Sequence, residues 1–137
     1  MTGPAHILVV DDDVDVRGVV LSLLESEGHQ VIEAADGRLA LDAVASSKTF
    51  DLIILDMMMP VMDGATFLEH MSRGPHASVP VVIFSSSPFD GLERFANVNS
   101  VVPKLDAIEG LLAAIRNVNR VEHAPRATPG AASRRPL

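Results

Sequence analysis

Three carboxylates of this chain follow short apolar runs, and they are the side chains best placed to do chemistry. Asp11 and Asp12 come directly after residues 7–10, and Asp56 comes directly after residues 52–55. An acid in such a place is by itself more often a cap or a turn residue than a reactive group. Acids that share one crevice repel each other unless a positive charge neutralises them. Mg²⁺ fits that requirement, because it binds carboxylates, keeps waters and leaves room for a phosphoryl oxygen.

Two further polar side chains end apolar stretches later in the chain. Ser85 offers a hydroxyl and Lys104 offers a fixed positive charge. Together with metal-bound acids on the same rim, they would make a site that handles a phosphoryl group. Asp56 is then the candidate nucleophile, because a carboxylate can accept a phosphoryl group as an acyl phosphate. Ser86 and Ser87 are alternative sources of the hydroxyl, and the plain alternative for the lysine is a solvated surface position.

The elements that must position these residues alternate along the chain between strand and helix. Apolar runs without polar alternation are typical of strands buried on both faces of a parallel sheet. Apolar residues at helical spacing predict helices between those runs. We predict strands at residues 7–10, 30–34, 52–55, 81–85 and 101–102, and helices at 14–27, after 36–37, at 64–72 and at 106–121. Between residues 86 and 99 the sequence supports only one or two helical turns.

This alternation, repeated five times, predicts an α/β fold with a doubly wound parallel sheet, (βα)5, and right-handed crossovers. Five such strands commonly take the order 2-1-3-4-5, which places the first and third strands side by side. The carboxyl ends of those two strands carry Asp11, Asp12 and Asp56. We therefore expect the fold to bring the three acids together, which their spacing in the sequence alone does not show.

Some residues near the predicted helices have a structural explanation. Asp13 is predicted to cap the helix at 14–27, and Asp106 is predicted to cap the last helix. Val19 and Leu39 belong to the apolar faces of the first and second helices, so we expect both side chains to be buried.

Composition limits the classes of protein to which the chain can belong. Its 137 residues suffice for one domain with a hydrophobic core, and the absence of cysteine fits a cytoplasmic location. The net charge of −7 argues against nucleic acid as a partner. The apolar runs are too short to span a membrane, and the N-terminus lacks the pattern of a signal peptide. Residues 1–122 form the predicted domain, and residues 123–137 are expected to be a disordered basic tail.

The motifs around the acids resemble the receiver domain of bacterial two-component response regulators, a family with a flavodoxin-like fold. The resemblance rests on the stretches 9–13 (VVDDD) and 55–64 (LDMMMPVMDG), together with Ser85 and Lys104, and it extends over residues 6–121. It implies that Asp56 accepts a phosphoryl group from a histidine kinase or a histidine phosphotransfer protein.

The same resemblance implies roles for the other residues of the site. Asp12 would bind Mg²⁺ directly, Asp11 would bind it through water, and Met58 would contribute its backbone carbonyl. Ser85 would hydrogen-bond the phosphoryl group, and Lys104 would form an ion pair with it.

The chain departs from the family pattern around the predicted fifth strand. In the family a proline usually follows the lysine, and an aromatic residue usually lies three positions before it. Here Leu105 follows Lys104, and Val101 stands at the aromatic position. The stretch between Ser85 and Lys104 is also short, which predicts an abbreviated fourth helix. Coupling of the strand-four hydroxyl to an aromatic on strand five therefore cannot operate in the usual way.

Three functions follow from these observations. The first is a stand-alone receiver that binds an unidentified downstream protein, with activity limited to self-phosphorylation and autodephosphorylation at Asp56; the predicted tail is too short for an effector domain. The second is a receiver-like interaction module that does not switch by phosphorylation. The third is a Mg²⁺-dependent phosphohydrolase with an aspartate nucleophile. Such enzymes usually have a second acid two residues after the nucleophile, where this chain has Met58, and that counts strongly against the third function.

Overall fold

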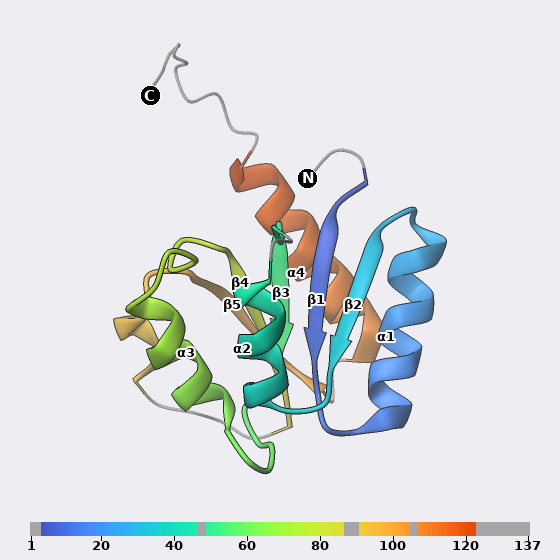
Figure 1. The fold of residues 1–137 in the computed structure, drawn as a ribbon. Helices are drawn as coiled ribbons and strands as arrows, with labels where there is room; N and C mark the ends of the chain where they lie inside the picture. The colour runs from blue at the N-terminus through green and yellow to red at the C-terminus, as the bar shows by residue number, and fades with distance from the viewer. Residues whose placement is uncertain (1–3, 47–48, 87–90, 105–106, 123–137) are drawn as a thin grey trace.

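The computed structural model describes residues 4–46, 49–86, 91–104 and 107–122, and its centre is a five-stranded parallel sheet (Figure 1). The strands are β1 (His6–Val10), β2 (Gln30–Ala34), β3 (Leu52–Leu55), β4 (Val81–Ser85) and β5 (Val98–Pro103). The helices are α1 (Val14–Ser26), α2 (Gly37–Ala45), α3 (Gly64–Ser72) and α4 (Ala107–Glu122), with one 3₁₀ turn, η1 (Leu92–Arg94). The strand order is β2-β1-β3-β4-β5, which confirms the predicted fold class and order.

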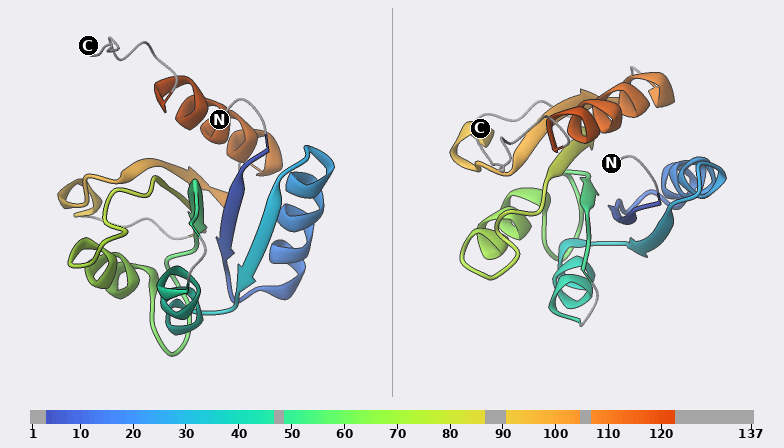
Figure 2. Two further views of the ribbon diagram at one scale, coloured as in Figure 1. Left: turned by 45° about the horizontal axis from the view of Figure 1, so that its top comes forward. Right: turned by 90° about the horizontal axis from the view of Figure 1, so that it is seen from above.

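Helices cover both faces of the sheet, α1 and α4 on one side and α2 and α3 on the other (Figure 2). Alternate residues of a strand therefore enter different cores. In β1, Leu8 and Val10 pack with residues of α2 and α3, whereas Ile7 and Val9 pack with residues of α1 and α4. Because both faces of the strand are buried, its sequence is apolar throughout, as expected of a parallel sheet under helices.

Aspartate caps fix where three of the helices begin, just after the carboxyl ends of strands or the loops that follow them. Asp13 accepts hydrogen bonds from the N–H groups of Asp15 and Val16, which confirms its predicted role as a cap. Asp36 and Asp63 cap α2 and α3 in the same way. These caps satisfy N–H groups that have no partner within the helix. The predicted cap Asp106 lies outside the described residues.

The connection from β4 to β5 differs from the other connections of the sheet. Within its described part, the only helical element is the single 3₁₀ turn η1, in agreement with the one or two turns predicted. The predicted strand at 101–102 is too short, since β5 begins at Val98. Its pairing with β4 shifts register once, so that Val81 lies opposite Val98 but Val82 lies opposite Ser100. Nothing in the sequence indicates that the strand begins earlier, because the polar residues Asn99 and Ser100 come directly before Val101.

Two side chains predicted to lie in the core are exposed. Val19 is 54% exposed and Leu39 is 49% exposed, while their neighbours Val20 and Ala40 are buried. Successive helical residues are about 100° apart around the axis, so a helix on a sheet buries only a narrow stripe. The apolar faces predicted for these helices were therefore too wide.

None of the helices in the described residues is both long enough and apolar enough to cross a membrane. Residues 123–137, predicted to be a disordered tail, lie outside the described residues.

Candidate functional site

The sheet brings the three predicted acids together at the carboxyl ends of β1 and β3. Val10 lies opposite Leu55 in the parallel register, and the N–H of Asp56 donates to the carbonyl of Val10 at 2.9 Å. Carboxylate oxygens of Asp11, Asp12 and Asp56 all lie within 4.8 Å of one another. Asp11 and Asp56 are buried, and Asp12 is exposed.

The hydroxyl and the lysine predicted for this site also reach Asp56, from two further strands. The Ser85 hydroxyl at the end of β4 donates to Asp56 Oδ1 at 2.9 Å. Lys104 follows β5, and its Nζ lies 2.9 Å from Asp11 Oδ2 and 3.4 Å from Asp56 Oδ2. Ser86, the neighbouring alternative, is exposed. We call Asp11, Asp12, Asp56, Ser85 and Lys104 the acidic edge.

Met58 lies two residues after Asp56, with its side chain largely in solvent. Its side chain is 58% exposed, and its N–H lies 3.5 Å from Asp56 Oδ1, at the limit of hydrogen-bond length. The predicted role of its carbonyl toward Mg²⁺ stays a prediction.

The positive charge of Lys104 compensates only part of the negative charge of the acidic edge. Burial raises the pKa of the Asp11 carboxyl above its usual value, and the nearby Asp56 acts in the same direction, although Lys104 and the Asp13 N–H act against them. Burial lowers the pKa of the Lys104 ammonium, but its contacts with Asp11 and Asp56 outweigh burial, so its pKa lies above the usual value. One ammonium thus faces two buried carboxylates, and negative charge is left over.

This donor set fits Mg²⁺. The ion prefers oxygen ligands, commonly binds through one or two carboxylates and retains waters. Here the convergent oxygens come from two buried acids and one exposed acid, so the cluster offers both fixed ligands and access to water. A divalent cation would also neutralise the charge that Lys104 leaves uncompensated. Asp11, Asp12 and Asp56 are the side chains that would hold it.

Two glycines hold the loop after Asp56 close to the rest of the fold. A Cβ on Gly64 would lie 2.7 Å from the carbonyl oxygen of Asp56 and 2.7 Å from Met57 Sδ. A Cβ on Gly37 would lie 2.6 Å from the carbonyl oxygen of Met62, which accepts the Gly37 N–H at 3.0 Å. Only residues without a side chain allow these approaches, so the loop packs closely against the start of α3 at Asp56 and against the start of α2 at Met62.

One residue close to the acids was missed in the sequence. The Arg17 Nη1 donates to the main-chain carbonyl of Asp11 at 2.6 Å, and its Nε donates to Glu33 Oε1 at 2.9 Å. Its position one helical turn after the cap Asp13 was the available signal. That signal is weak, because an arginine in a first helical turn commonly points into solvent.

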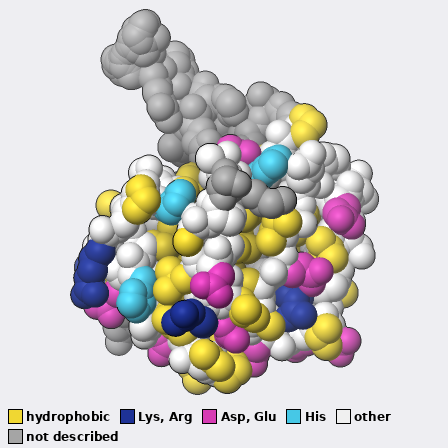
Figure 3. Space-filling view, in the orientation of Figure 1, with side chains coloured by type: hydrophobic (Ala, Val, Ile, Leu, Met, Phe, Trp, Pro, Cys, Tyr) yellow, Lys and Arg dark blue, Asp and Glu magenta, His cyan; other side chains and the backbone are white. Residues whose placement is uncertain are grey.

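Two cavities differ in their relation to the acidic edge. A cavity of about 680 Å³ lies between α2 and α3, and none of the residues that line it belongs to the acidic edge. The face with α2 and α3 in Figure 3 mixes apolar side chains with acidic, basic and imidazole groups. A smaller cavity of about 270 Å³ borders Lys104, between Val19 of α1 and Ile108 of α4.

Known proteins share both the sequence pattern and the fold. Residues 7–116 match the family model of the response regulator receiver domain. The response regulator MprA of Mycolicibacterium vanbaalenii is 37% identical over 122 residues, which are 85% of this chain and 51% of that protein. The chain thus spans about half the length of the curated relatives it matches.

Solved receiver structures extend the comparison. Chemotaxis protein CheY4 of Vibrio cholerae has a TM-score of 0.74 and 28% identity, covering 85% of this chain and 99% of that one. The response regulator TrrA of Thermotoga maritima, solved in complex with Mg²⁺-BeF, has a TM-score of 0.70 and 22% identity, covering 83% of this chain and 98% of that one. At that identity, TrrA supports the fold alone. On the family match and the MprA identity, the chain belongs to the response regulator receiver domain family.

Proposed function

We propose that Asp56 accepts a phosphoryl group from a histidine kinase or a histidine phosphotransfer protein, with Mg²⁺ bound at the acidic edge. Receiver domains are signalling domains that bind Mg²⁺ in an acidic pocket and interact with such donors. The observation that carries the proposal is the surroundings of Asp56. It is a buried carboxylate that accepts a hydrogen bond from Ser85 at 2.9 Å and faces Lys104 at 3.4 Å.

The transfer forms one bond and breaks one. An oxygen of the Asp56 carboxylate bonds to phosphorus, and the bond from phosphorus to the imidazole nitrogen of the donor breaks. That nitrogen keeps the electron pair and takes up a proton where one is needed to leave a neutral imidazole. Lys104 and the Ser85 hydroxyl then contact the phosphoryl oxygens in place of the free carboxylate. When bound, Mg²⁺ supplies positive charge to a phosphoryl oxygen.

Each residue of the acidic edge has a distinct task under this proposal. Asp12, the exposed acid, would hold the metal directly, and Asp11, whose carboxylate lies 2.9 Å from Lys104 Nζ, would hold it through water. Met58 would add its carbonyl. TrrA, which shares the fold, was solved in complex with Mg²⁺-BeF, and that complex agrees with a metal-binding role for a protein of this fold.

A second function is favoured by the region around β5. An interaction module that does not switch would keep the three acids, but phosphorylation of Asp56 would not change the partner-binding surface. Val101 is 51% exposed, and one 3₁₀ turn stands in the described part of the β4–β5 connection. Neither function specifies which downstream protein the chain would bind. The prediction of a stand-alone receiver, with residues 1–122 as its domain, stays a prediction.

One experiment separates these functions. The full chain is incubated with Mg²⁺ and a small acyl-phosphate donor, and its mass is measured. We expect an adduct of about 80 Da, the mass of a phosphoryl group. Asp56→Asn should abolish it. Asp51→Asn is the matched control, because Asp51 is an exposed acid at the opposite end of the same strand, and this variant should keep the adduct.

The possible outcomes have different consequences. An adduct on the wild type and the control, absent from Asp56→Asn, supports phosphorylation at Asp56. No adduct on the wild type contradicts it and favours the interaction module. Repeated turnover of phosphate esters would instead favour the hydrolase.

A further inference from the structure

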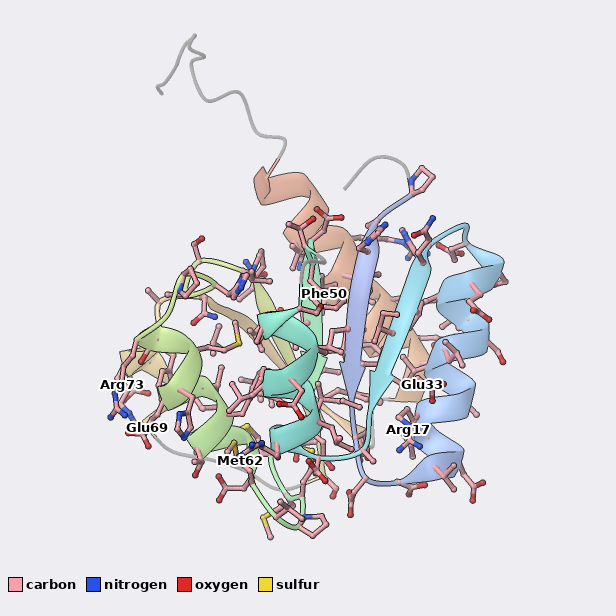
Figure 4. All side chains as sticks on the ribbon, viewed as in Figure 1. Arg17, Glu33, Phe50, Met62, Glu69 and Arg73 are labelled. Carbon is pink, nitrogen blue, oxygen red and sulfur yellow. The ribbon has the colours of Figure 1, made fainter. Side chains whose placement is uncertain are left out.

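Arg17 joins α1 to the two strands beside it. It extends from the first turn of α1 toward β2, where Glu33 lies next to it (Figure 4). Its Nε donates to Glu33 Oε1 at 2.9 Å, and its Nη1 donates to the carbonyl of Asp11 at 2.6 Å. The side chain is only 15% exposed, whereas the Arg38 side chain on α2 is 68% exposed. Such burial and two separate acceptors distinguish Arg17 from a solvated surface arginine.

The contact between Arg17 and the Asp11 carbonyl matters because it holds one of the two peptide groups that flank Asp12. The carbonyl of Asp11 belongs to the peptide before Asp12, and Arg17 holds it. The N–H of Asp13 belongs to the peptide after Asp12, and it donates to Asp11 Oδ1 at 2.9 Å. The N–H of Asp11 is held too, by the carbonyl of Ala34 at 3.1 Å. Both peptides that flank Asp12 are therefore fixed by hydrogen bonds.

The Asp12 side chain itself has no such restraint. Among the described residues, its carboxylate makes no hydrogen bond and no ion pair, and it is exposed. Repulsion from Asp11 and Asp56 favours its rotation away into water. Its direction toward the other two acids thus depends on its backbone, and of the two flanking peptides the first is held by Arg17.

We propose that Arg17 is a positioning residue that directs Asp12 toward the metal by holding the Asp11–Asp12 peptide. This inference rests on the proposed Mg²⁺ site and deepens it. Residues that orient ligands without touching a metal typically account for about 10- to 100-fold in metal affinity. Arg17→Met, which keeps a chain of similar length without donors, should therefore weaken Mg²⁺ binding by about 10-fold or more.

The sign of the effect separates positioning from simple electrostatics. Arg17 is a positive charge near a cation site, so its charge alone opposes Mg²⁺. If charge were its only influence, Arg17→Met would strengthen Mg²⁺ binding. Positioning requires the opposite change.

The test is a Mg²⁺ titration of the full chain without any phosphoryl donor. The chain has no Trp and no Tyr, so amide chemical shifts or calorimetry replace intrinsic fluorescence. Arg38→Met is the matched control, because it also removes one positive charge from a helix, but among the described residues Arg38 pairs only with Asp42, at 3.7 Å. Arg17→Lys is the second variant: it keeps the charge, but a single ammonium cannot reproduce the fork that spans both acceptors.

A third measurement asks whether Arg17 acts through Asp12. In an Asp12→Asn background, Arg17→Met should change the Mg²⁺ affinity much less than in the wild type, which is the coupling that a double-mutant cycle measures. A merely structural role would lower stability in both backgrounds and leave no such coupling. The metal-free thermal midpoint is recorded for every variant, so loss of folding is detected independently.

Weaker Mg²⁺ binding by folded Arg17→Met or Arg17→Lys, with Arg38→Met unchanged, supports the proposal. Unchanged or tighter binding by the Arg17 variants overturns it, and so does an equal effect in the Asp12→Asn background. If Arg17→Met does not fold, Arg17→Lys decides by the same criteria. If the wild type itself does not bind Mg²⁺, the proposed function fails, which is a different result from failure of the positioning role alone.

Discussion

The acidic edge and the flank formed by η1 and β5 differ in how tightly their side chains are held by contacts with the rest of the fold. At the acidic edge, side chains from the carboxyl ends of four strands meet at Asp56, and the loop after it packs closely against Gly37 and Gly64. At the fifth-strand flank, by which we mean η1 and β5, Val101 is 51% exposed and the strand shifts register against β4. The comparison indicates that the two regions are constrained to different degrees. The ends of the sheet strands hold the side chains of the acidic edge in mutual contact, whereas β5 pairs with β4 through an irregular register and leaves Val101 exposed.

The largest effect is expected at Lys104. Lys104→Met leaves the buried carboxylates of Asp11 and Asp56 without their cation, and it should lower the free energy of unfolding by about 1–3 kcal/mol at pH 7. The pKa of Lys104 is raised in the fold, so its stabilisation is present below the usual lysine pKa and is lost as pH rises through the raised value. Urea unfolding followed by circular dichroism measures this loss, and mass spectrometry should show much less phosphoryl adduct.

Arg116→Met serves as the control for lost charge, because Arg116 is exposed on α4. An unchanged unfolding free energy for Lys104→Met would contradict the assignment of Lys104 to the acidic edge.

A comparable loss is expected from crowding the backbone of Asp56. Gly64→Ala would place a Cβ 2.7 Å from the Asp56 carbonyl oxygen, and overpacking of this kind costs about 1–3 kcal/mol. Gly74→Ala is the control, since its nearest neighbour would be an ordinary 3.8 Å away. Thermal unfolding of both variants checks the difference, and equal midpoints would show that the loop after Asp56 has room to move.

A smaller effect, of opposite sign, is expected at Asp11. Its raised pKa means that the folded chain holds the proton more tightly than the unfolded chain. Its contribution to stability is therefore most favourable below the usual aspartate pKa and declines as pH rises through the raised value. Without metal, Asp11→Asn should unfold at a higher temperature than the wild type near neutral pH, and the gain should disappear in acid.

Added Mg²⁺ should make the wild type more stable than Asp11→Asn. At ten times its dissociation constant, a ligand stabilises the fold by about 1.4 kcal/mol, and Asp11→Asn should lose most of that gain. Thermal unfolding with a chelator measures the difference in metal-free stability, and thermal unfolding with Mg²⁺ measures the stabilisation by the metal. Asp42→Asn is the exposed control. A metal-free midpoint for Asp11→Asn below that of the wild type would contradict the expected gain in stability.

The smallest effect is expected at the fifth-strand flank. Val101→Thr keeps the branched shape at a half-exposed position, so the unfolding free energy should change by less than about 0.5 kcal/mol. The phosphoryl adduct at Asp56 should form as in the wild type. A loss of adduct equal to that of Lys104→Met would remove the distinction between the two regions.

Much of the fold was predictable because local patterns and the global arrangement agree. The unbroken apolar runs 52–55 and 81–85 predict buried strands, and both are observed as β3 and β4. The same patterns failed for Val19 and Leu39, since periodicity finds an apolar face but not how wide a stripe the sheet covers.

The sequence by itself determined the residue types of the acidic edge and the strand ends on which they sit. Only the tertiary structure decided their distances, because side chains far apart in the chain meet through the register of a parallel sheet. It put Ser85 rather than Ser86 against Asp56, and it brought Lys104 to Asp11 across strands that are not neighbours in sequence. It also gave Arg17 its two acceptors. No local rule predicts such a contact, since it depends on how α1 packs beside β1 and β2.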